Sequence, residues 1–168
     1  MKKLLFLSFV LSLVLLWACP MITSNSIDKG SYKFPRWLKG QWKATTGKDS
    51  GHIYMIEGKQ GVQGCATATG ISDVDGKPTG DAPYQLILSD VGGQLFLNIY
   101  NVGDDESPAG WMLYRLRKTN DSQFTLDGVE EDAIDQKASS EDIKKYLLAN
   151  QSKDIYDKRE EMSFAKVK

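Results

Sequence analysis

The chain has 168 residues, of which 41% are hydrophobic, and its 21 lysine and arginine residues against 22 aspartate and glutamate residues leave a net charge of −1 at pH 7. This balance, without any arginine-rich run, excludes nucleic acid as a partner, because nucleic-acid-binding proteins need clustered positive charge. The single histidine, His52, likewise excludes metal sites built from several histidines.

Residues 1–18 have the pattern of an export signal peptide. Two lysines precede the apolar run Leu4–Trp17, which is shorter than the roughly 20 apolar residues that a membrane-spanning helix needs. The run ends in Leu16-Trp17-Ala18-Cys19, which resembles a bacterial lipobox. The resemblance implies cleavage before Cys19 and a lipid anchor, palmitate included, on that cysteine.

Two alternatives to lipidation remain open, because Trp17 is bulky for its position in a lipobox. One is release as a soluble protein after cleavage near Ser24–Ser26, and the other is a retained membrane anchor. If Cys19 is lipidated, Pro20 in place of an aspartate favours the outer membrane, on its periplasmic face. The polar residues that follow predict a flexible tether over 19–35.

The remaining residues, 36–168, have the size of one compact domain. Short alternating runs separated by turn residues predict β-strands, the pattern of a barrel or sandwich. The seven runs are Lys39–Thr45, His52–Glu57, Val62–Thr69, Tyr84–Ser89, Gln94–Tyr100, Trp111–Lys118 and Gln123–Leu126.

A helix and a last strand are predicted after these runs. Ser139 is a helix-capping residue, and apolar side chains recur at helical spacing from Ile143 until Asn150, which suits a helix end. Met162–Val167 then completes eight strands, which suffice to close a small barrel. The predicted fold class is therefore mainly β, a single antiparallel barrel of about eight strands with one helix before the last strand.

Trp42 is predicted to point into the barrel, since it shares a strand face with Leu38 and Gly40, whereas Gln41 lies on the opposite face. The run Trp37-Leu38-Lys39-Gly40-Gln41-Trp42 resembles the Gly-x-Trp motif of lipocalins, and in particular that of small bacterial lipocalin-like lipoproteins. The resemblance implies that Trp42 closes one barrel end beneath a basic residue, for which Lys166 and Arg117 are the candidates.

No set of residues predicts catalysis, so we expect a protein that is not an enzyme and has no cofactor. His52 starts a strand without a partner for a catalytic triad, and Cys65 is interpreted as a buried, inert thiol. The run Asp73-Val74-Asp75-Gly76 lacks the later ligands of a calcium loop and is interpreted as a polar turn.

Two functions stay open. Aromatic and aliphatic residues on the strands suggest either a packed core or the wall of a cavity for a small hydrophobic or amphipathic ligand. The candidate ligand-binding residues are Trp42, Tyr54, Leu86, Leu97 and Tyr114. The alternative is an envelope protein–protein module with a filled core, in which the loops Ile71–Ala82 and Gly103–Gly110 contact the partner.

Overall fold

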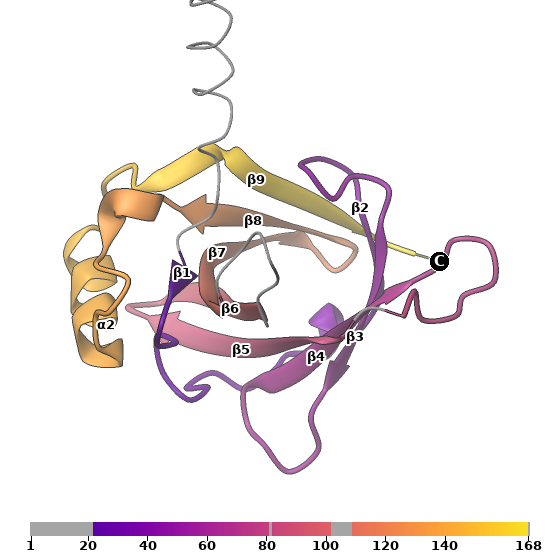
Figure 1. Cartoon of the computed structure of the whole chain (residues 1–168), viewed down its shortest axis with the longest axis horizontal. Coiled ribbons are helices and arrows are strands. Elements are labelled where there is room, and N and C mark those ends of the chain that lie inside the picture. Colours follow the sequence, from indigo (N-terminus) through magenta and orange to yellow (C-terminus); the bar gives the residue numbers. More distant parts are fainter. Residues whose placement is uncertain (1–21, 81, 102–108, 168) are drawn as a thin grey trace, which may run out of the picture.

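The computed structural model describes residues 22–80, 82–101 and 109–167 (Figure 1). The predicted signal peptide, Cys19 and most of the loop predicted over Gly103–Gly110 lie outside the described residues. Within the described ranges, no helix is both long and apolar enough to cross a membrane.

Nine strands and one α-helix make up the described part of the chain. The strands are β1 (Ile22–Thr23), β2 (Gly40–Ala44), β3 (Ile53–Gly58), β4 (Cys65–Ile71), β5 (Tyr84–Val91), β6 (Gln94–Asn101), β7 (Gly110–Asn120), β8 (Gln123–Val129) and β9 (Tyr156–Lys166). The helix is α2 (Ser140–Ala149), and two short 3-10 helices cover Arg36–Leu38 and Glu131–Ala133.

Strands β2 to β9 form a closed antiparallel barrel. Each strand pairs with the next along the chain, and β9 also pairs with β2, so the eight strands form a ring (Figure 1). Closure leaves no long free edge that could pair with another chain. The predicted fold class is confirmed, including the single helix before the last strand.

The barrel has an inner core and a second core on its outer surface. Strand β7 contributes to both, because Tyr114 and Leu116 point inward, whereas Leu113 packs outward against Ile143 and Leu147 of α2. The helix begins as predicted, since the Ser139 side chain accepts a hydrogen bond from the Asp142 backbone N–H at 3.2 Å. Apolar residues on both faces of β7 therefore reflect its position between barrel interior and helix.

The predicted flexible tether is wrong for residues 22–35, which pack on the barrel. Strand β1 pairs with β7 at Met112 and Trp111, where β8 does not cover that edge. Ile27 is only 1% exposed and belongs to the outer core, and Phe34 belongs to the inner core. A polar stretch with few apolar residues resembles a linker by composition, although two of its apolar residues are buried on the barrel.

A buried polar network fastens this N-terminal segment to β5 and β6. The Asn98 side chain accepts a hydrogen bond from the Ile27 N–H at 2.8 Å and donates to Ile87 O and Ser89 Oγ. Ser89 in turn donates to Asp28 Oδ1 at 2.7 Å. Burial acts to raise the pKa of Asp28, but the hydrogen bonds from neighbouring side chains and backbone N–H groups outweigh it and lower this pKa.

Asn98→Ala is expected to loosen the N-terminal segment. The substitution leaves buried polar partners unsatisfied, and each such group costs about 1–3 kcal/mol. We expect a lower urea midpoint and faster proteolysis between Asp28 and Phe34. Gln85→Ala, on an exposed position of β5, is the control. Unchanged proteolysis of the Asn98 variant would contradict a docking role for the network.

Candidate functional site: a cavity in the barrel

Trp42 is packed in the inner core of the barrel. Its ring is fully buried, its Nε1–H donates to Leu38 O at 2.8 Å, and the Phe124 ring lies 4.7 Å away in an edge-to-face arrangement. The Lys166 ammonium lies 5.2 Å from the centre of the Trp42 ring and donates to Trp37 O. The inward orientation of Trp42 is confirmed, and Lys166 is the basic residue that covers it.

Arg117, the other predicted cover, points to the outer surface. Its Nε and Nη2 groups donate to the Asp127 carboxylate, each at 2.6 Å, and Arg115 donates to the same carboxylate at 2.8 Å. The hydrogen bond with Asp127 raises the pKa of Arg117. The Arg115 guanidinium also stacks 3.7 Å over the Tyr156 ring. This cluster is a satisfied ion pair that joins β7, β8 and β9.

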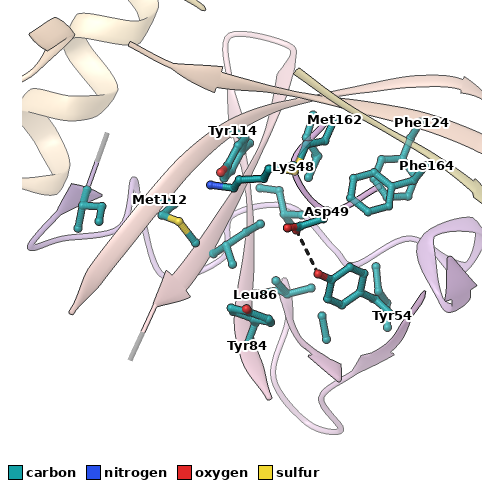
Figure 2. Close-up of a pocket in the computed structure, with 16 residues that line it drawn as sticks. Lys48, Asp49, Tyr54, Tyr84, Leu86, Met112, Tyr114, Phe124, Met162 and Phe164 are labelled. Atoms are coloured by element: carbon teal, nitrogen blue, oxygen red, sulfur yellow. Dashed lines mark hydrogen bonds between the residues drawn. The ribbon is translucent and has the colours of Figure 1, made fainter. Parts of the chain in front are cut away.

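Beyond Trp42 the side chains of the described residues leave part of the barrel interior unfilled. A cavity of about 230 Å³ lies between the strands (Figure 2), slightly below the usual range of ligand pockets, about 300–1,000 Å³. Its lining residues are Ile22, Lys48, Asp49, Tyr54, Ile56, Ala68, Tyr84, Leu86, Leu97, Ile99, Met112, Tyr114, Phe124, Leu126, Met162 and Phe164. A small and mostly apolar molecule matches this wall.

Four of the five predicted ligand-binding residues line the cavity, namely Tyr54, Leu86, Leu97 and Tyr114. The fifth, Trp42, does not line it, because Phe124 packs against its ring and separates it from the cavity. Trp42 therefore belongs to the packed part of the inner core instead of the cavity wall. Met112 and Met162 also line the cavity but were not among the candidates, although Met112 lies two positions before Tyr114 and therefore on the same face of β7.

Lys48 and Asp49 bring charge to the cavity from the loop between β2 and β3. This loop is held on β9, since Thr45 N–H donates to Ser163 O at 2.8 Å and Ser163 N–H donates to Thr46 Oγ1. Asp49 Oδ2 accepts a hydrogen bond from the Tyr54 hydroxyl at 3.1 Å (Figure 2). Both residues lie between the predicted strands Lys39–Thr45 and His52–Glu57, and no local pattern indicates that this turn reaches the cavity.

Gly47 allows the loop to approach β9 closely. Its φ of +83° is one that residues with a side chain rarely adopt. A Cβ atom at this position would also lie 2.7 Å from Met162 Cγ. The loop conformation that carries Lys48 to the cavity thus depends on a glycine.

The other residues considered for chemistry lie away from the cavity. His52 is exposed, Cys65 is a free and half-buried thiol instead of the fully buried one predicted, and Asp75 pairs with Lys77 on the surface. Among the residues that the structure describes, no group of three or more His, Cys, Asp and Glu side chains could hold a metal ion.

Comparisons with known proteins found no matching family model, no matching curated protein and no matching solved structure. The resemblance to lipocalin-like lipoproteins thus stays a prediction that rests on the Trp42 motif and on the layout of the chain.

Proposed function

We propose that this protein is exported, anchored to the outer membrane through a lipid on Cys19, and binds a small hydrophobic or amphipathic molecule inside its barrel without catalysing a reaction. The observation that carries the proposal is the unfilled cavity of about 230 Å³. Protein interiors are normally packed with few voids larger than a water molecule. A void of this size with an apolar wall is therefore a reasonable place for a ligand.

The position of β1 supports a link between anchor and cavity. Ile22 lines the cavity, and Cys19 precedes it by three residues, a span of at most about 11 Å in an extended chain. A lipid on Cys19 would therefore hold this part of the cavity near the membrane surface. Hydrophobic molecules that partition into the membrane would then be concentrated beside it.

The packing of the N-terminal segment also favours cleavage before Cys19 over cleavage near Ser24–Ser26. The later cut would separate β1 from Ile27 and remove the pairing of Ile22 with Met112. A protein processed at Cys19 retains all of these contacts. Of these two cleavage sites, only the one before Cys19 leaves a mature chain that keeps the described fold.

The second candidate is a protein–protein module of the envelope. One observation favours it: Val74, in the loop predicted to contact a partner, is 96% exposed. A single exposed apolar residue is common on protein surfaces, however, and does not form a patch. The incompletely filled barrel favours the ligand-binding function.

Native mass spectrometry of the full chain, purified from its own envelope in a mild detergent, tests the two functions. We expect a protein peak accompanied by a bound mass of a few hundred daltons or less, consistent with the cavity. A stoichiometric complex with another protein, with no small molecule retained, would support the interaction module and contradict the ligand-binding proposal.

Cys19→Ala is expected to abolish lipidation. Metabolic labelling with a palmitate analogue should mark the wild type, and the variant should lose the label and leave the membrane fraction. Cys65→Ala provides the matched control, because it removes the other cysteine and should keep the label. An unlabelled wild-type protein cut near Ser26 would contradict the lipobox interpretation.

A further inference from the structure

Glu160 is a carboxylate on the inner side of the barrel. Its side chain is 4% exposed, and it precedes by two residues Met162, which lines the cavity. Space for it comes from Gly128, which pairs with the inward-pointing Tyr114. A Cβ atom at Gly128 would lie 2.7 Å from Glu160 Cβ and 3.4 Å from Tyr114 Cε1. The carboxylate therefore lies next to Tyr114, behind the cavity wall.

The charge of Glu160 is balanced by Lys48. The Lys48 ammonium lies 3.4 Å from Glu160 Oε2, and this oxygen accepts no hydrogen bond from the described residues. Buried carboxylates are costly unless a cation and hydrogen bonds compensate them. Lys48 thus supplies the cation, although its geometry leaves this oxygen without a hydrogen bond.

Lys48 is a replaceable partner. Its side chain is 52% exposed and comes from a loop, so its ammonium can return to water. Lys48 lines the cavity whereas Glu160 does not, and Figure 2 draws the lysine extending on the Tyr114 side of the cavity. Movement of Lys48 would uncover the carboxylate to a molecule in the cavity.

The charges at this place favour a cation over an anion. Asp49 and Glu160 carry two negative charges, and Lys48 carries the one positive charge among the cavity-lining residues and Glu160. An anionic head group would add a negative charge beside two carboxylates, whereas a cationic one would neutralise the excess.

We infer that the ligand is an amphipathic amine, whose apolar part lies among Leu86, Leu97 and Phe164 and whose ammonium takes the place of the Lys48 ammonium at Glu160. This inference rests on the proposed function and specifies its ligand class. Lys48 acts as an internal competitor: it neutralises Glu160 in the empty barrel and moves into solvent when the amine enters.

The test uses three probes with the same alkyl chain, namely octylamine, octanol and octanoate. The full lipidated chain, labelled with ¹³C on the methionine methyl groups, is titrated with each probe in detergent micelles. Met112 and Met162 line the cavity and report entry, whereas Met55, next to the inward-facing Ile56 and outside the cavity lining, is the internal control. We expect octylamine to shift Met112 and Met162 at the lowest concentration, with octanol weaker and octanoate weakest.

Two substitutions separate the roles of the ion pair. Glu160→Gln should weaken octylamine binding about tenfold or more, because the ligand loses its buried counter-charge. It should weaken octanol binding much less, because octanol carries no charge. Lys48→Ala should strengthen octylamine binding severalfold, because the competing ammonium is gone. Glu161→Gln is the matched control, since Glu161 is half-exposed and pairs with Arg117 on the outer surface.

The outcomes distinguish the inference from the proposed function. If octanoate binds most strongly and Lys48→Ala weakens its binding, the ligand is anionic and the inference is wrong. The ligand-binding function would still stand. Equal binding of octanol and octylamine, with no effect of Lys48→Ala, would also overturn it. If no probe shifts Met112 or Met162, the proposed function fails as well. The Lys48 variant keeps the test decisive if Glu160→Gln does not fold.

Discussion

Trp42→Ala is expected to destabilise the barrel by about 3–5 kcal/mol, the usual cost of truncating a fully buried aromatic residue. The indole lies in the inner core of the barrel, where it packs against Phe124 and donates to Leu38 O. Alanine would leave a void and an unpaired carbonyl, and Lys166 would lose the ring beneath its ammonium. Because a domain of this size is stable by only about 5–15 kcal/mol, the variant should melt far below the wild type or fail to accumulate.

Gln41→Ala is the control for this prediction. Gln41 neighbours Trp42 on β2 but lies on the opposite face and is only half-buried. Its backbone carbonyl accepts a hydrogen bond from Val167 N–H, which alanine retains. Surface substitutions of this kind usually stay within about 0.5 kcal/mol. Equal, small shifts in the melting temperature of both variants would contradict the conclusion that Trp42 stabilises the barrel core.

Ala68→Phe is expected to abolish ligand binding while the barrel still folds. Ala68 lies on the inner face of β4, pairs with Ile56 and Tyr84, and lines the cavity. A phenyl ring at this position would occupy the space that we assign to the ligand. Overpacking typically destabilises a protein by about 1–3 kcal/mol. Because the cavity offers free space for the ring, we expect a loss of stability of about 1 kcal/mol or less.

Thr67→Phe is the matched control, since Thr67 adjoins Ala68 but lies on the outer face of β4, half-buried. Native mass spectrometry and thermal unfolding should be run on both variants. We expect the bound mass to disappear from Ala68→Phe and to persist in Thr67→Phe. Retention of the ligand by a folded Ala68→Phe protein would place its binding site outside the barrel.

Local sequence patterns were sufficient to predict the barrel and most of the residues on its inner face. Alternation along β6 places Leu97 inward and Asn98 outward, as the structure has them. The capping role of Ser139 and the turns between strands depend on neighbouring residues, so they could be predicted without tertiary contacts. The inward position of Trp42 follows from the same period of two.

The residues at which strands begin and end depended on pairing with strands that are distant in the sequence. The predicted last strand began at Met162, whereas β9 begins at Tyr156, because the charged run between them pairs with β8 around an irregularity. The predicted strand from Val62 instead begins at Cys65, and Val62 is exposed. A prediction from local hydrophobic alternation therefore misses strand residues that are charged and includes apolar residues that lie outside a strand. It contains no information about which backbone groups pair.

The amino-acid sequence alone therefore determined the fold class, the inward-facing side of the strands and four residues of the cavity wall, since these follow from periodicity over a few residues. The docking of Ile27 on Asn98 joins positions 71 apart in the chain, and the pairing of Lys48 with Glu160 joins positions 112 apart. The cavity arises between residues from strands all around the barrel. Such contacts have no local signature, because burial and charge compensation depend on which strands the closed barrel brings together. Whether an interior is filled depends on the summed volumes of side chains from all eight strands.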